Sequence, residues 1–148
     1  MNASYPKTQK NLAILLSNSY VLLTKTQNYH WHVTGPNFSS LHGLFEEQYR
    51  DLFEAIDTIA ERIRALGGMA PASLVQFLEH ATLVEGDASL SANLMVKDLL
   101  ESHEKLIDDL KKAISVSSDE GEFVSEGLYT ERLEVHEKSA WMLRMSLI

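Results

Sequence analysis

Leucine and other large apolar residues recur every three or four positions along almost the whole chain. The pattern covers residues 6–33, a second stretch that begins between Asn37 and Ser40 and ends at Leu66, and residues 89–116 and 122–146. This spacing places apolar side chains on one face of an α-helix, and no useful length of sequence alternates as a β-strand does. The sequence therefore predicts an all-α protein with four long helices.

The connections between the predicted helices indicate how the helices are arranged. Gly35 and Pro36 end the first helix and leave only a short link, and SSDEGE (117–122) breaks the pattern between the last two. The middle connection, 67–88, is long, and SLVQFLEHA (73–81) within it predicts a short helix. A plain up-and-down bundle does not need so long a link. We expect a ferritin-like four-helix bundle with one long crossover that contains a short extra helix.

The composition limits the class of protein. With 148 residues, 45% of them hydrophobic, the chain can form one ferritin-like domain, expected to span residues 1–148. It has no long apolar run for a membrane and no apolar signal segment at its N-terminus, so we expect a cytoplasmic protein. The absence of cysteine excludes thiolate metal sites, and a net charge of −8 argues against a large basic surface for nucleic acid.

Histidines and carboxylates form a second pattern on the second helix, which carries His42, Glu46, Asp57 and Glu61. On a helical wheel with His42 at the origin, the other three lie at about 40°, 60° and 100°, so all four share one face. The pairs His42/Glu46 and Asp57/Glu61 are each one turn apart, and each pair can bind one ion. His30, at the end of the preceding helix, can fold back toward His42. Imidazole and carboxylate ligands suit iron, and zinc or manganese could take the same place.

One chain cannot bring the two pairs together. His42 and Asp57 are separated by roughly 22 Å of helix, whereas a metal–ligand bond is about 2 Å long. If two copies of the helix pack antiparallel about a twofold axis, the pair from one chain lies beside the complementary pair from the other. No histidine here follows a glutamate by three positions, so the Glu-x-x-His motif of single-subunit di-iron bundles is absent. We therefore expect a symmetric homo-oligomer with two equal shared sites.

The string YHWHVTGPNFSSLHGLFEEQY (29–49), followed by EAIDTIAERIRALGG (54–68), resembles the Dps family, the DNA-binding proteins from starved cells. The resemblance implies a hollow dodecamer that oxidises Fe(II), preferably with hydrogen peroxide, stores ferric mineral and protects DNA from oxidative damage. It also implies a ferroxidase centre across the twofold interface, with Trp31 beside it. The family pattern maps onto His30, His42, Glu46, Asp57 and Glu61.

The sequence departs from the family pattern at some positions, and other functions stay open. Glu46 stands where Asp is commoner, and His32, where Asn is frequent, is either an extra ligand or a surface residue. With only Lys7 and Lys10 in the N-terminal segment, we expect weak or no direct DNA binding. The alternatives are a DNA-binding, nucleoid-compacting protein with secondary iron chemistry, a structural bundle that takes up no iron, and storage of zinc or manganese without a redox step.

The remaining polar residues have simpler interpretations. A solvated helix face accounts for Glu47, Arg50, Asp51 and Glu54. Structural or surface roles are expected for His80, His103 and His136. Two interpretations, an iron-entry pore at a threefold axis or acids that suit a helix N-terminus, apply to Asp119, Glu120, Glu122 and Glu126.

Overall fold

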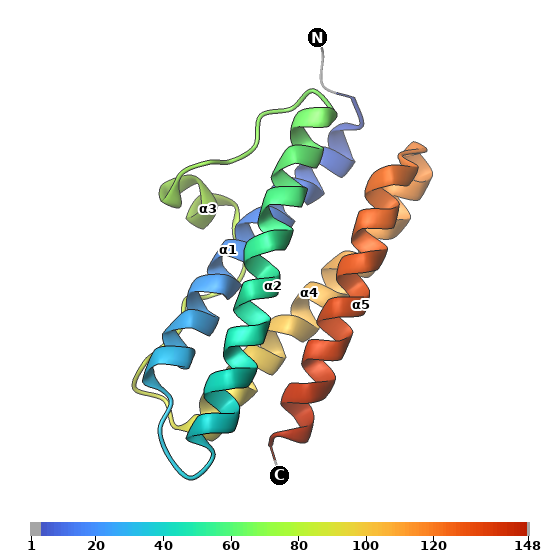
Figure 1. The fold of residues 1–148 in the computed structure, drawn as a ribbon. Coiled ribbons are helices and arrows are strands. Elements are labelled where there is room, and N and C mark those ends of the chain that lie inside the picture. The colour runs from blue at the N-terminus through green and yellow to red at the C-terminus, as the bar shows by residue number, and fades with distance from the viewer. Residues whose placement is uncertain (1–3, 148) are drawn as a thin grey trace.

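The computed structural model describes residues 4–147, and this part of the chain contains helices and no strands. The helices are α1 (Pro6–His32), α2 (Phe38–Ala65), α3 (Leu74–His80), α4 (Ala92–Glu120) and α5 (Phe123–Met145). Four of them are long and lie side by side, while the short α3 packs outside the bundle (Figure 1). The predicted ferritin-like arrangement is confirmed. Within residues 4–147, no helix has the length and apolar character that a membrane crossing requires.

The helices pair as the lengths of their connections predict. Short links join α1 to α2 and α4 to α5, so each pair forms an antiparallel hairpin (Figure 1). The crossover leaves the end of α2, passes through α3 and runs along the bundle to the start of α4 at the opposite end. Ser73 caps α3, because its side chain accepts a hydrogen bond from the backbone N–H of Gln76.

The end of α4 differs from the prediction. The apolar pattern stops near Val116, but the helix continues to Glu120. Serine and acidic residues can continue a helix, and the helix ends only where Gly121 adopts a left-handed conformation with φ 75°. The N–H of Glu122 then donates to the carbonyl of Ser117 at 2.8 Å, which satisfies the helix end.

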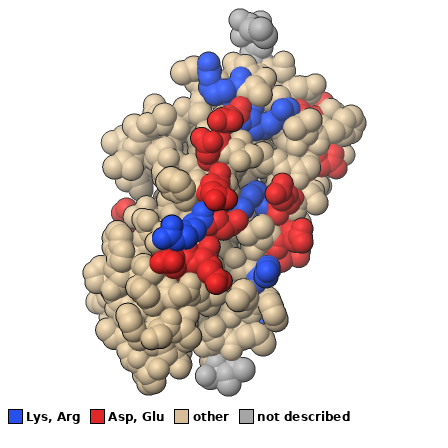
Figure 2. Space-filling view, viewed as in Figure 1, with Lys and Arg blue, Asp and Glu red and all other residues tan. Residues whose placement is uncertain are grey.

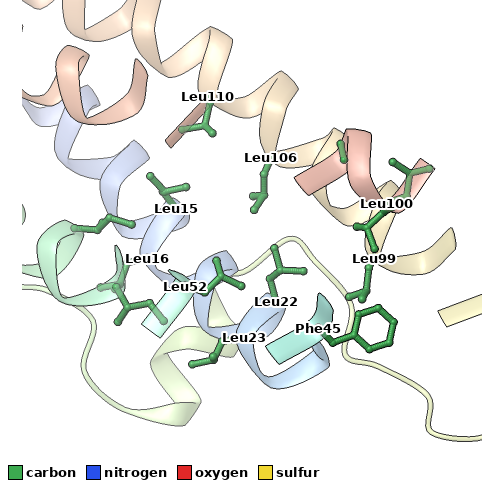
Figure 3. Close-up of a cluster of buried hydrophobic side chains, with 14 of the residues drawn as sticks. Leu15, Leu16, Leu22, Leu23, Phe45, Leu52, Leu99, Leu100, Leu106 and Leu110 are labelled. Atoms are coloured by element: carbon green, nitrogen blue, oxygen red, sulfur yellow. The ribbon is translucent and has the colours of Figure 1, made fainter. Parts of the chain in front are cut away.

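The core lies between the two hairpins and consists mainly of leucine. Side chains from α1, α2 and α4 meet there, among them Leu22, Phe45, Leu52, Leu99 and Leu106 (Figure 3). Each of these side chains is at most 1% exposed. Truncating one of them to alanine should cost about 2–5 kcal/mol. This rigid packing fixes the corner between α1 and α2, where the predicted histidine ligands lie.

Candidate metal centre

His30 and His42 meet at the corner between α1 and α2. His30 lies in the last turn of α1, the chain turns through Gly35 with φ 111°, and α2 brings His42 back alongside. The two imidazole rings stack with their centroids 3.7 Å apart and their planes 11° from parallel. The structure therefore brings these two predicted ligands together within one chain.

Two hydrogen bonds fix the orientation of these rings. Nδ1 of His30 lies 2.7 Å from the backbone carbonyl oxygen of His42, and Nδ1 of His42 lies 2.7 Å from the carbonyl oxygen of His30. A carbonyl oxygen can only accept, so each Nδ1 carries a hydrogen and donates it. In a neutral ring the lone pair is then on Nε2, which is the atom available to a metal ion.

Glu46 lies one turn after His42 and extends toward His30. Its Oε1 is 3.8 Å from Nε2 of His30, and its Oε2 is 3.4 Å from Nε of Arg50. The Glu46 side chain is 43% exposed, whereas the His30 side chain is only 8% exposed. The carboxylate is thus close to a buried imidazole and still open to an incoming ion.

Asp57 and Glu61 lie apart from this corner, both exposed on α2. At 1.5 Å per residue, Asp57 is roughly 22 Å along the helix from His42. Within residues 4–147 of one chain, no group of three or more His, Cys, Asp or Glu side chains could hold a metal ion. One chain therefore holds the two halves of the predicted site separately, and completion by a second chain stays a prediction.

An apolar groove of about 880 Å³ lies beside Asp57, between α1, α2 and the crossover. Phe53 and Leu74 line it and are 70% and 76% exposed, respectively. Tyr20 and Phe77 stack against each other in its wall, with ring centroids 3.9 Å apart. Large apolar side chains exposed around one groove are typical of a surface that a partner covers.

Two residues next to His30 at the end of α1 are more exposed than His30 itself, which is 6% exposed. Trp31 is 65% exposed at the end of α1. His32 is also exposed, and its Nδ1 donates to the carbonyl oxygen of Asn28 at 2.8 Å, within its own helix. These contacts favour the interpretation of His32 as a surface residue.

Asp51 lies on the predicted solvated face, with its side chain 40% exposed, but the sequence did not indicate its contact with α5. Its two carboxylate oxygens accept hydrogen bonds from Arg132 of α5 at 3.2 and 2.9 Å. The sequence interpretation also missed the contact between His103 and His136, which are buried and whose Nδ1 atoms lie 2.9 Å apart. His103 falls on the apolar stripe of α4, and that position is the signal that could have indicated burial.

Burial changes the protonation of both core histidines. It lowers the pKa of His103 to about 3, and the positive charge of Arg132 acts in the same direction. Burial also holds the pKa of His136 well below its usual value, with His103 and Arg132 contributing. Both imidazoles are therefore neutral near pH 7.

Two of the acids considered for a pore have structural contacts. The Glu122 carboxylate accepts hydrogen bonds from the backbone N–H groups of Val124 and Ser125 and so caps α5. Glu120 accepts from the backbone N–H groups of Lys7 and Thr8, in the first turn of α1. These contacts favour the helix-terminus interpretation for both residues.

Comparisons with known proteins agree with this geometry. A ferritin-like domain model matches residues 9–147. A low-temperature-induced protein of Nostoc is 49% identical over 134 residues, which cover 87% of this chain and 73% of the relative. DNA protection during starvation protein 2 of Bacillus anthracis is 40% identical over 131 residues, which cover 86% of this chain and 87% of the relative. The crystal structure of a Dps protein from Bacillus brevis superimposes with a TM-score of 0.96 and 34% identity, covering 100% of both chains. This chain therefore belongs to the Dps family of the ferritin-like superfamily.

Proposed function

We propose that the protein is a ferroxidase and an iron store. It oxidises Fe(II), preferably with hydrogen peroxide, keeps the ferric mineral inside a hollow dodecamer in the cytoplasm, and so protects DNA from oxidative damage. The observation that carries this proposal is the corner between α1 and α2, where His30 and His42 present free Nε2 atoms beside Glu46. Membership of a ferritin-like family supports it.

A second copy of the chain supplies the other half of the site. The midpoint of α2 between His42 and Glu61 falls between residues 51 and 52, and the midpoint between Glu46 and Asp57 falls at the same place. A twofold axis there places His42 opposite Glu61 of the partner and Glu46 opposite Asp57 of the partner. The exposed Phe53 lies next to this point, and its 70% exposure supports an interface that covers it.

The residues of the shared site have different tasks. The imidazoles of His30 and His42 bind Fe(II) through Nε2 and hold the ion at the interface. The carboxylates balance the extra positive charge that iron gains on oxidation, and this favours the ferric product. Hydrogen peroxide accepts one electron from each of two Fe(II) ions and two protons from solvent, and its O–O bond breaks to give two water molecules. Iron and peroxide would thus be consumed together without release of a hydroxyl radical. Zinc or manganese would bind the same ligands without this redox step.

An oxidation assay tests the proposal. Fe(II) is added anaerobically to the purified protein, hydrogen peroxide follows, and ferric absorbance is recorded over time. His42→Ala and Asp57→Ala should lose most of the rapid phase, because each removes a ligand from a different half of the site. Glu47→Ala is the matched control, because Glu47 is exposed and adjoins Glu46 without belonging to the site. Equal oxidation by all variants and by protein-free buffer would reject the proposal.

Direct DNA binding is the rival function. The Bacillus anthracis relative is named for DNA protection, which fits either function. The net charge of −8 opposes attraction to phosphate. Figure 2 shows acidic side chains gathered in a band across the front of the bundle, interleaved with basic ones. We expect weak or no gel retardation by the metal-free protein at low salt. Clear retardation without iron-dependent consumption of peroxide would favour the rival.

A further inference from the structure

A line of polar side chains runs from the surface of the bundle into its core. Arg132 donates to Asp51, and its Nη2 also lies 3.3 Å from Nε2 of His136. Nδ1 of His136 in turn lies 2.9 Å from Nδ1 of His103. The side chain of Asp51 is 40% exposed, whereas His136 and His103 are 0% and 1% exposed. The line therefore connects solvent with the interior between α4 and α5.

The hydrogen bonds along this line have only one consistent direction. A guanidinium can only donate, so Nε2 of His136 accepts from Arg132 and carries no hydrogen. The neutral His136 then carries its hydrogen on Nδ1 and donates it to Nδ1 of His103. The neutral His103 carries its own hydrogen on Nε2, so the line ends in an N–H donor inside the core.

This last donor has no acceptor in the described part of the chain. Nε2 of His103 is buried without a hydrogen-bond partner there, and so are both Nε2 and Oε1 of Gln48. Ser19 Oγ and Arg132 Nε are likewise buried without a partner there. A buried polar group without a partner is costly, and five such atoms in one chain are uncommon. The core therefore has polar atoms that need a partner.

The register of α2 against α5 places Gln48 at the level of the histidine pair along the bundle. The two helices run antiparallel, because Arg62 contacts Ser125 while Asp51 contacts Arg132. Gln48 lies one turn before Asp51 on α2, and His136 lies one turn after Arg132 on α5. Gln48 and His136 are therefore at the same level of the bundle, where His136 contacts His103.

We propose that a buried water molecule binds in the core between His103 and Gln48. It accepts the hydrogen of His103 Nε2 and bonds to the side-chain amide of Gln48. Buried waters typically make about three hydrogen bonds to groups that would otherwise lack partners. A metal cation does not fit, because Nε2 of His103, the atom of the histidine pair that lacks a partner in the described part of the chain, carries a hydrogen and Arg132 adds positive charge. The amide of Gln48 offers both a donor and an acceptor, which suits water better than an anion.

High-resolution X-ray and neutron diffraction from the assembled, metal-free protein test this proposal. We expect one ordered water within about 2.7–3.2 Å of both His103 Nε2 and the Gln48 amide. The neutron map should show deuterium on Nδ1 of His136 and on Nε2 of His103. An empty core, a metal ion at this place, or deuterium on Nδ1 of His103 would each overturn the proposal.

The substitution Gln48→Met gives a second test, because the proposal and a dry core predict different changes in Tm. Methionine has a similar shape but cannot hold the water, so Tm should fall by about 2–4 °C. If the Gln48 amide instead lies unpaired in a dry core, removing its polar atoms would leave Tm unchanged or raise it. Glu47→Met is the matched control, because it places the same side chain at the adjacent exposed position. Its Tm should stay near that of the parent.

Discussion

His30 and His42 orient each other through backbone acceptors, because each Nδ1 donates to the carbonyl oxygen of the other residue at 2.7 Å. Neither hydrogen bond uses the other imidazole as its acceptor. Replacing one ring therefore leaves the hydrogen bond of the other ring in place. A variant at either position reports the loss of a ligand rather than collapse of the corner.

The first prediction concerns metal affinity. His42→Ala should weaken Zn(II) binding to the assembled protein by about 100-fold or more, because it removes one imidazole from the shared site. Isothermal titration calorimetry measures this change. His32→Ala is the control, since His32 is exposed and its Nδ1 donates within its own helix. Equal weakening by both variants would make His32 a ligand and change the proposed site.

The second prediction concerns the contact between α2 and α5. Asp51→Asn should lower the free energy of unfolding by about 1–3 kcal/mol, because Arg132, with its side chain 8% exposed, loses its counter-ion. Chemical denaturation measures the change. Glu104→Gln is the control: the Glu104–Arg144 pair is 3.3 Å apart and about half exposed, so it should contribute less than about 1 kcal/mol. Equal losses would show that the Asp51 pair is an ordinary surface ion pair.

The third prediction concerns acid stability. His103 and His136 have lowered pKa values in the folded protein, so the unfolded chain binds more protons as pH falls below about 6.5. The contribution of His103 to stability is complete above that pH and is lost between about 6.5 and 3. The contribution of His136 is lost in the same direction as pH falls below about 6.5. Together they should make the free energy of unfolding fall by up to roughly 2.7 kcal/mol per pH unit, a slope reached where the unfolded histidines are protonated and the folded ones are not.

Denaturation at a series of pH values measures this slope. The double variant His103→Leu/His136→Leu should have a shallower slope over the same window, because it removes both buried imidazoles. His80→Leu, at the exposed end of α3, is the control and should keep the slope of the parent. If the double variant has the same slope as the parent, groups other than these two histidines cause the acid sensitivity.

The sequence predicted those features that depend on neighbouring residues. Apolar spacing within each helix was sufficient for the four long helices, and the Gly35–Pro36 break was sufficient for the corner between His30 and His42. The end of α4 was predicted too early, because Ser117 to Glu120 carry no apolar signal although they continue the helix to Gly121.

Contacts between distant parts of the chain could not be predicted in this way. Asp51 and Arg132 are 81 positions apart, and their contact depends on the register of α2 against α5, which no local pattern specifies. The pairing of His103 with His136 depends in the same way on the register of α4 against α5. The proposed metal site is harder still to predict from local patterns, because two of its five ligands would come from another chain.

Mixed oligomers test most directly whether two chains share each site. His42→Ala and Asp57→Ala chains carrying different tags are co-expressed, and assemblies that contain both are compared with each variant alone in the peroxide-driven Fe(II) oxidation assay. In a mixed dimer, one site receives both altered residues and the other receives none. With equal amounts and random pairing, the mixture should recover about a quarter of the parental rate, while each variant alone stays near the protein-free background. If the mixed assemblies are no more active than either variant alone, neighbouring chains do not complete each other's site.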